Sequence, residues 1–467
     1  RRPPTVPQRR GARQPLSPWR DPRARALGAC LVGLCAFLAY LATVAPTITW
    51  QFSGVDSGDL ASAVATWGIP HPTGFPLYVL LGGVVTHLLP FGQPAFRLNL
   101  FSAACSAAAA GLVFLTVLRL AVRSALPEPA RWIVAAGAAL ALAWSRTLWS
   151  QSVLAEVYAL EMLFAALLSF MLAEPEPTPA SLPALAFVAG LSLTDHLTII
   201  FSIAAGALLL ALRFRGRLLQ PRLLLRAGAA FVLPLALYLL LPWRASQHPA
   251  SDWNDPTTLS RFWDVVTATQ YHRLLDWSPV DLFVAVPAIA RSLIGQWMPW
   301  VLPLAVLGAT VWWRRDRPYT VYLIVLTVLA SAFVALYRAH GRERYLLQAV
   351  LAITLLAALA LLAALEWLSA RLAARHRDRF LLLAAGAACA ATVLPALIVG
   401  LGDFNLRDDW SAWNYAVNTL DAAPRSAFLL TYTDEQTFPL WYAQRAAGVR
   451  PDVLVQPQSW HDPVHQR

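Results

Sequence analysis

The sequence predicts an all-α polytopic membrane protein with about eleven transmembrane helices. Of its 467 residues, 58% are hydrophobic and only 13% are charged, and the mean hydropathy is +0.52. A soluble globular protein has about 25% charged residues. A chain so poor in charge cannot cover several soluble cores with polar surface, so the expected solvent is the lipid bilayer. The lengths of the apolar runs and the positions of the arginines then predict the number and direction of the spans.

Eleven apolar runs come close to the span length of about 20 residues that a bilayer requires. The predicted spans are residues 27–45, 98–118, 132–148, 153–172, 182–194, 197–212, 223–241, 297–313, 319–337, 345–367 and 380–401. A further apolar run at 76–89 has only about 14 residues, below the spanning length. We predict that it is an interfacial helix on the outer face, because a crossing there would place the arginines of the 119–131 loop outside.

Arginine sets the orientation, because the chain contains no lysine. Cytoplasmic loops are enriched in basic residues, and with the N-terminus inside, 23 of the 37 arginines fall in cytoplasmic segments. The N-terminus is therefore predicted to be inside and the C-terminus outside. The chain is therefore predicted to have three parts. These are a cytoplasmic arginine-rich tail at 1–26, a transmembrane domain at 27–401, and an extracytoplasmic segment at 402–467 that looks like the start of a domain. Long outer loops are predicted at 46–97 and 242–296, with a second interfacial helix at 257–275.

Several classes of function are excluded by composition and spacing. The arginines occur in short clusters between apolar runs, not in a stripe with interleaved aromatic residues, which argues against nucleic-acid binding. The four cysteines lie within apolar segments without a CxxC pair or a zinc-site spacing, so no metal site or disulfide is predicted. Ionisable residues are nearly absent from the middle of the spans, whereas proton-coupled transport normally needs some.

The first outer loop contains the run VDSGDLASAVATWGIPHPTGFPL at residues 55–77. If a helix begins near Ser57, Asp56 and Asp59 approach one face of its first turn. Ordinary helix capping would also explain acids at this position. The Pro-His-Pro turn that follows would hold His71 near the two carboxylates. We therefore predict Asp56 and Asp59 as catalytic candidates and His71 as a substrate-binding residue.

Two further sites on the same outer face contain ionisable residues: Glu156, and the pair Asp195 and His196. Glu156 is at the outer start of the fourth span, where an ionisable residue facing the bundle is a functional candidate. A solvated helix end is the competing explanation. Asp195 and His196 separate two short apolar runs, a pattern typical of a helix that breaks to line a cavity, although an exposed turn would give the same pattern.

The outer loop YRAHGRER, residues 337–344, places Arg338, Arg342 and Arg344 outside, against the general trend of arginine. An anionic partner such as phosphate, which arginine binds in a bidentate manner, would explain them. Contact with anionic lipid headgroups is the alternative. In the second outer loop, the aromatic and acidic residues of 243–258 are candidates for contact with a sugar, or for simple anchoring at the interface.

These motifs resemble a known family. DSGDLASAVATWGIPHPTGFPL, followed by FRLNLFSAACSAAAAG, resembles the DSGE, HPPGYPL and RVNLFSA signature of a large uncharacterised bacterial membrane-protein family. EVYAL at Glu156, GLSLTDH ending at His196, and DEQTFPLWYAQRAAGVRPDV at 434–453 also match. The family's eukaryotic relative is a transmembrane protein O-mannosyltransferase, and the family is placed among the GT-C glycosyltransferases, which use polyprenyl-phosphate sugars. This chain differs from the usual pattern at Asp59, Thr73 and Asp195, where the family has Glu, Pro and Asn.

The resemblance implies a GT-C-like fold and an inverting glycosyltransferase in the bacterial inner membrane, with its active site outside. The donor would be a polyprenyl-phosphate sugar whose phosphate is held by Arg338, Arg342 or Arg344, and the acceptor a protein or glycan hydroxyl deprotonated by Asp56. No cofactor beyond this lipid-linked substrate is predicted. Two alternatives stay open: a transporter or flippase of lipid-linked saccharides, and a non-catalytic membrane lipid-binding protein.

Overall fold

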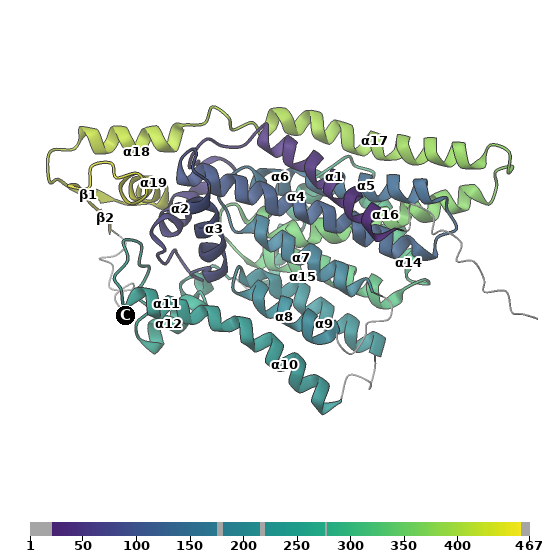
Figure 1. Ribbon diagram of the computed structural model, residues 1–467, viewed down its shortest axis with the longest axis horizontal. Helices are drawn as coiled ribbons and strands as arrows, with labels where there is room; N and C mark the ends of the chain where they lie inside the picture. Colours follow the sequence, from purple (N-terminus) through teal and green to yellow (C-terminus); the bar gives the residue numbers. More distant parts are fainter. Residues whose placement is uncertain (1–20, 175–180, 215–219, 276–277, 459–467) are drawn as a thin grey trace, which may run out of the picture.

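The computed structural model is a bundle of long helices with a cap of shorter elements at one end (Figure 1). The structure describes residues 21–174, 181–214, 220–275 and 278–458. Within these ranges the secondary structure is helical except for one two-stranded parallel sheet and two isolated β-bridges. The all-α prediction is therefore confirmed in its essentials.

Seven helical segments are long and apolar enough to cross a membrane among the described residues. They contain α1 (Pro22–Leu41), α4 (Pro94–Leu120), α9 (Ile200–Phe214), α10 (Pro221–Leu235), α15 (Arg317–Leu336), α16 (Leu347–Ser369) and α17 (Arg377–Asp403). Shorter helices of the bundle are α5 (Glu128–Ala143), α6 (Arg146–Ser152), α7 (Tyr158–Leu172), α8 (Ser181–Leu193), α13 (Pro279–Ile294) and α14 (Val301–Trp312). The chain is a multi-pass membrane protein.

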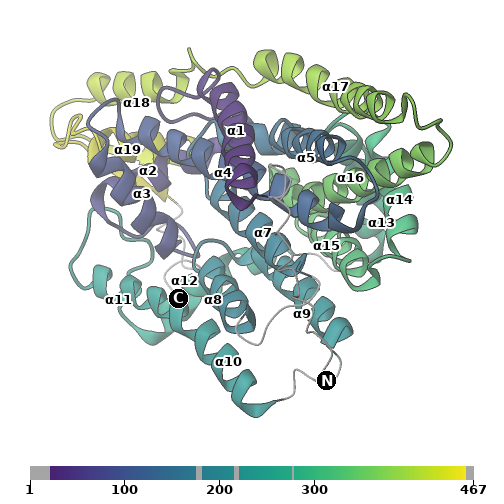
Figure 2. The same ribbon diagram turned by 45° about the vertical axis from the view of Figure 1, so that its right-hand side comes forward.

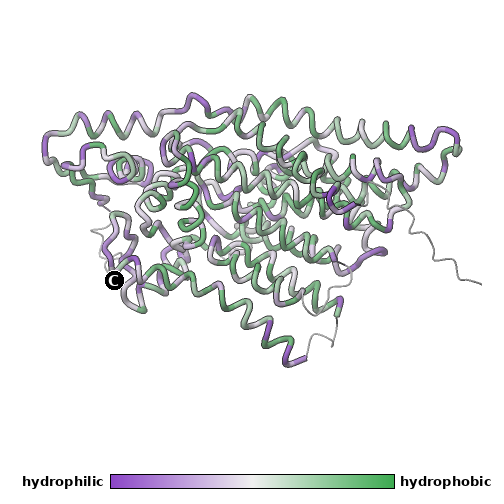
Figure 3. The backbone as a smooth tube through the Cα atoms, in the orientation of Figure 1, coloured by the Kyte–Doolittle hydropathy of each residue, from purple (hydrophilic) through white to green (hydrophobic). Residues whose placement is uncertain are grey.

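The outer surface of the bundle is suited to lipid. Large apolar side chains are exposed along its helices, including Leu225 at 75% and Ile398 at 71% exposure. Exposed apolar area on this scale is typical of a membrane-facing surface. Figure 3 shows the same distribution, with apolar residues along the long helices and polar residues concentrated in the cap and in the loops at the opposite end.

Each predicted span coincides with helix, but some boundaries were wrong. The first helix begins at Pro22 instead of residue 27, because Asp21 accepts a hydrogen bond from the Arg23 amide and proline is suited to the first helical turn. Residues 22–26 therefore belong to α1, while most of the predicted tail lies outside the described residues. The third predicted span is broken: α5 and α6 meet at 65°, because Ser145 has an extended backbone between them.

The second outer loop contains more helix than predicted. The predicted interfacial helix is divided into α12 (Leu259–Val266) and a 3-10 turn, η7 (Thr269–Leu274), because Ala268 between them has a positive φ of 54°. α13, at Pro279–Ile294, was predicted to be loop. Its internal proline, Pro287, and its charged residues concealed the helix in a search for long apolar runs.

The cap is built from segments far apart in the sequence (Figures 1 and 2). It contains η2 (Gln51–Asp56), α2 (Ser57–Thr66), α3 (Pro76–Leu88), α11 (Leu240–Ala245), α12, η7, α18 (Ser411–Ala422), α19 (Asp434–Arg445), β1 (Phe428–Thr431) and β2 (Leu454–Pro457). α3 is the apolar run that the arginine distribution placed outside the set of spans, and in both views it lies beside α2 in the cap.

Candidate active site

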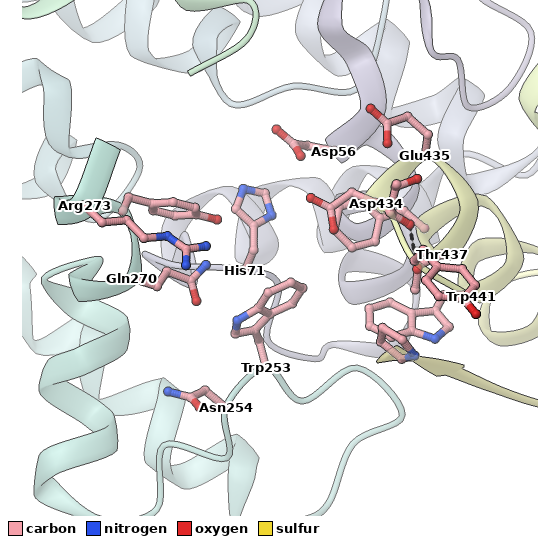
Figure 4. Close-up of a pocket in the computed structure, with 15 residues that line it drawn as sticks. Asp56, His71, Trp253, Asn254, Gln270, Arg273, Asp434, Glu435, Thr437 and Trp441 are labelled. Atoms are coloured by element: carbon pink, nitrogen blue, oxygen red, sulfur yellow. Dashed lines mark hydrogen bonds between the residues drawn. The ribbon is translucent and has the colours of Figure 1, made fainter. Parts of the chain in front are cut away.

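A cavity of about 430 Å³ opens in the cap between three parts of the chain (Figure 4). The first outer loop, the second outer loop and the C-terminal segment each contribute to its lining. The lining residues include Asp56 and His71; Trp253, Asn254, Gln270, Tyr271 and Arg273; and Tyr432, Thr433, Asp434, Glu435, Thr437, Phe438 and Trp441.

Backbone contacts hold the two outer loops together at this cavity. The Ile69 amide donates to the Ser251 carbonyl at 2.7 Å, and the Trp253 amide donates to the Ile69 carbonyl at 3.1 Å. Gly68 permits this approach, because a Cβ atom there would lie 2.3 Å from the Ser251 carbonyl oxygen. His71 and Trp253 are thereby placed in one cavity, with their rings 6.1 Å apart.

Asp59 is used to hold His71. Its side chain is buried, and its Oδ2 accepts a hydrogen bond from the His71 amide at 2.8 Å and lies 2.9 Å from His71 Nδ1. α2 begins at Ser57, as predicted, but neither acid makes a side-chain capping bond to the helix amides. Helix capping therefore does not account for the two carboxylates.

His71 lies in an electrostatic environment that favours its charged form. Burial opposes protonation, but the negative charge of Asp56 and the hydrogen bond to Asp59 outweigh it and raise the His71 pKa to about 9. An imidazolium ion at neutral pH can donate Nδ1–H to Asp59. Its other N–H then remains available for an acceptor group in the cavity.

Arg344 brings two of the predicted acids together. Its Nη2 lies 3.4 Å from Asp56 Oδ2, and its Nη1 lies 3.5 Å from Glu156 Oε1 and donates to the Ser53 carbonyl at 2.9 Å. Glu156 is almost fully buried, whereas 23% of the Asp56 side chain is exposed. Asp56 is therefore the acid of this group that reaches the cavity, and Figure 4 shows it beside the His71 ring.

The other two arginines of the loop are placed differently. Like Arg344, Arg338 and Arg342 are not among the lining residues of the cavity, but Arg344 contacts Asp56 of that lining. Arg342 Nη1 donates to the Tyr337 carbonyl at 3.4 Å, and the Arg338 amide donates to the Leu274 carbonyl at 2.9 Å. This second contact joins the loop to η7 and so positions Arg273, which does line the cavity.

Asp195 and His196 do not line the cavity. The predicted helix break is present, since α8 ends at Leu193 and the next helical residue is Leu197. His196 Nδ1 lies 3.1 Å from Glu161 Oε2 in a buried polar network. Asp195 is fully buried, and neither of its carboxylate oxygens has a hydrogen-bond partner among the described residues. His196 is linked to the site through Phe75, on which it stacks and which contacts the His71 ring. It also contacts the rings of Tyr158 and Tyr345, over which the Arg344 guanidinium lies.

A second cavity, of about 300 Å³, includes Arg344 in its lining. Its other polar lining residues include Arg146, Gln151, Arg291 and Gln296. Arg344 Nε and Gln151 Oε1 are buried without a hydrogen-bond partner among the described residues. Arg344 therefore lines this second cavity, contacts Asp56 of the first cavity and has an unused donor. Arg291 was not singled out from the sequence.

The C-terminal segment supplies residues that sequence reasoning did not assign to the site. Asp434 lines the same cavity as Asp56, on the side of it away from Arg273 (Figure 4), and burial, reinforced by the negative charge of Asp56, raises its pKa to about 6. Trp441 adds an aromatic wall and is covered by Arg445 at 4.1 Å from the ring centroid. The available signal was the DEQTFPLWYAQR match, which contains both residues. Among the described residues, no group of three or more His, Cys, Asp or Glu is placed to hold a metal ion.

Comparison with known proteins gives relatives along most of the chain. Residues 56–219 match the family of the Protein O-mannosyl-transferase TMEM260 N-terminal domain, and residues 412–461 match TMEM260-associated domain 2. The mouse Protein O-mannosyl-transferase TMEM260 is 29% identical over 93% of this chain. The chain spans 63% of the length of that mouse protein.

Solved structures share the fold at low sequence identity. ArnT from Cupriavidus metallidurans, bound to undecaprenyl phosphate, has a TM-score of 0.59 and 14% identity, covering 94% of this chain and 90% of its own. The oligosaccharyltransferase AglB from Archaeoglobus fulgidus, in complex with an inhibitory peptide and a dolichol-phosphate, has a TM-score of 0.51 and 12% identity, covering 91% and 64%. These matches confirm the resemblance and the GT-C-like fold that it implied: the chain is similar over most of its length to the TMEM260 family of protein O-mannosyl-transferases.

Proposed function

We propose that this chain is a glycosyltransferase that transfers a sugar from a polyprenyl-phosphate donor to an acceptor hydroxyl. Its similarity to a protein named as an O-mannosyl-transferase favours mannose and a protein acceptor. The shared fold with ArnT and AglB, whose structures contain undecaprenyl phosphate and dolichol-phosphate, favours a lipid phosphate as the carrier.

The proposed topology keeps about eleven crossings, with the N-terminus inside and the C-terminus outside a bacterial inner membrane. The cap, including α2, α3 and the segment from residue 402 onward, then lies on the extracytoplasmic side, where the donor's sugar would be used. The supporting observation is the arginine distribution, because the loop arginines concentrate at the end of the bundle opposite the cap.

One observation carries the catalytic proposal: the partly exposed carboxylate of Asp56 lies at the cavity with Arg344 and His71 beside it. In the proposed step, the acceptor hydroxyl attacks the anomeric carbon and gives its proton to Asp56. The bond from the anomeric carbon to the phosphate oxygen breaks, with inversion, and the polyprenyl phosphate leaves. Arg344 and the His71 imidazolium stabilise the negative charge on the leaving phosphate.

The arrangement also favours Arg344 over Arg338 and Arg342 as the phosphate ligand. Arg344 lines the second cavity and contacts Asp56 of the first, and its buried Nε lacks a partner among the described residues. A phosphate on the side of Arg291 and Arg146 would satisfy this donor while the sugar enters the cavity of Asp56. Trp253 and Trp441 are placed to contact the apolar face of a sugar.

A ligand screen by thermal unfolding tests this proposal directly. A ligand at 100 times its dissociation constant adds about 2.7 kcal/mol of stability. We expect polyprenyl-phosphate mannose to raise the Tm of the purified protein, and Arg344→Gln to abolish the shift while Arg342→Gln retains it. A screen in which no polyprenyl-phosphate sugar raises the Tm of the parent protein would contradict the proposed donor class.

A further inference from the structure

A cavity of about 450 Å³ lies at the end of the bundle opposite the cap. It is lined where α4, α14 and α16 end and α15 begins. The lining residues are Arg119, Leu120, Val122, Arg123, Ser124, Ala125, Ala173, Trp312, Arg315, Asp316 and Glu366. α15 separates the two sites, because its other end at Tyr337 pairs with Leu275 of the cap. With 20 residues it is about 30 Å long.

Two side chains of the lining, Trp312 and Arg123, have hydrogen-bond donors without an acceptor among the described residues. Trp312 is buried, and its indole Nε1, which can only donate, has no partner among the described residues. Arg123 is exposed and makes no hydrogen bond or ion pair within the described part of the chain. Arg119 Nη1 donates to the Phe170 carbonyl at 2.9 Å and lies 3.6 Å from a half-exposed Glu174, so Arg119 adds positive charge to the lining but is not an unpaired group. A ligand that fits here offers several acceptor oxygens and carries negative charge.

The two acids of the lining are already used. Asp316 accepts two hydrogen bonds from Arg213, at 2.8 and 3.1 Å, and a third from the Tyr319 amide at the start of α15. Glu366 is paired with Arg315 at 2.5 Å. Neither carboxylate is therefore free to neutralise Arg119 or Arg123, and the cavity keeps an excess of positive charge.

The surroundings place the cavity at the depth of lipid headgroups. Three arginines at this end lie over tryptophan rings: Arg315 over Trp312, Arg317 over Trp313 and Arg371 over Trp367, the last at 3.7 Å from the centroid. Tryptophan with arginine beside it is typical of the membrane–water interface. Leu120, Ala125 and Ala173 add apolar side chains to the lining of the cavity, and the exposed Val122 also lies there.

We propose that this cavity binds the phosphate group of an anionic membrane phospholipid, with Arg123, Arg119 and the Trp312 indole N–H as its ligands. Basic pockets between transmembrane helices are established sites for anionic headgroups. The lipid's acyl chains lie along the apolar surface of the bundle. The site lies at the opposite ends of α15 and α16 from the candidate active site and does not depend on the proposed transfer reaction.

The test is equilibrium binding of a fluorescent phosphatidylglycerol to the full chain purified in neutral detergent. Arg123→Gln is the principal variant, because Arg123 is exposed and its loss leaves the fold intact. We expect its affinity to fall at least about fivefold, the equivalent of about 1 kcal/mol per basic residue at a membrane surface. Trp312→Phe, which keeps an aromatic side chain and leaves the charge of the cavity unchanged but removes the N–H, should also weaken binding.

Arg317→Gln is the matched control. Arg317 lies at the same end of the bundle and over the Trp313 ring, but it does not line the cavity. This variant should bind phosphatidylglycerol as the parent does. Equal losses in Arg123→Gln and Arg317→Gln would show general attraction to positive charge and overturn the site. Displacement of the lipid by inorganic phosphate or glycerol 3-phosphate would also overturn it, since the cavity would then take a soluble anion.

Discussion

Asp56 and Asp59 are three residues apart, yet their surroundings give them different tasks. Asp56 reaches the cavity, whereas Asp59 is buried against His71. We predict that Asp56→Asn keeps the fold and donor binding but lowers turnover by roughly 100-fold or more, the lower range of general base catalysis. Asp59→Asn should reduce turnover less but lower the Tm more, because a buried hydrogen-bonded acid is lost.

Turnover by both variants and their thermal unfolding decide between the acids. The reverse ranking of turnover would make Asp59 the base. Small and equal losses of turnover would remove both from the chemistry.

Arg344 is predicted to matter far more than its neighbours in the same loop. It is largely buried between Asp56 and Glu156, so truncation leaves two acids without their partner, which costs several kcal/mol. Arg344→Ala should weaken donor binding by about 100-fold or more, and Arg344→Lys should not restore it, since lysine cannot bridge both acids in this geometry. Arg342→Ala should change donor affinity less than about fivefold, because one positive charge at a membrane surface contributes only about 1 kcal/mol to binding.

The raised pKa of His71 predicts that its contribution to the stability of the protein depends on pH. Its pKa is about 9 in the folded protein against 6.5 for a free side chain. The charged form is favoured by folding, so its stabilisation is complete below pH 6.5 and is lost as the pH rises through about 9. The difference in Tm between the parent and His71→Gln should therefore shrink from pH 6 to pH 9.5. A difference that grows with pH would show that His71 is neutral in the folded protein.

At the scale of elements, the contact of α2 with α19 assembles the cavity. A Cβ atom on Gly58 would lie 2.7 Å from backbone atoms of Phe438, so the two helices can be this close only with glycine. We predict that Gly58→Ala displaces α19 and costs about 1–3 kcal/mol, as for an overpacked core. Turnover should fall as well, because Asp434 and Trp441 move with α19.

Gly386→Ala is the control for this substitution. Gly386 lies inside α17, where a Cβ atom would meet no other atom within 4 Å, and alanine is preferred to glycine in helices. Its Tm and turnover should equal or slightly exceed those of the parent protein. An unaffected Gly58→Ala would show that the close contact does not hold the cap together.

The elements were predictable where a single physical signal governs them. The lengths of the apolar runs predicted a helix at each span, and each of these spans does contain helix. The distribution of arginines kept α3 out of the set of predicted spans. α13 was not predicted as a helix because Pro287 and Arg291 interrupt its apolar pattern. The cavity was harder, since Asp56 and Arg344 are 288 residues apart and only tertiary packing brings them together. The sequence placed both on one face of the membrane but could not pair them, and it did not assign Arg273 or Asp434 to the site.

At the scale of the whole molecule, the proposed topology predicts opposite accessibility for the two ends. Gln247, near α11 in the cap, and Arg375, between α16 and α17, are both exposed in the structure. In intact cells, a membrane-impermeant thiol reagent should label Gln247→Cys but not Arg375→Cys, in a chain whose four native cysteines are replaced. Labelling of Arg375→Cys alone would reverse the orientation and place the cavity inside.

Transfer itself tests the central claim most directly. The parent protein and Asp56→Asn are reconstituted separately with radiolabelled polyprenyl-phosphate mannose and a membrane extract as the source of acceptors. We predict that the parent releases polyprenyl phosphate and forms a labelled product with the opposite anomeric configuration, and that Asp56→Asn does so at least about 100-fold more slowly. Donor that crosses the bilayer intact, or a product formed equally well by Asp56→Asn, would contradict a glycosyltransferase that acts through this cavity.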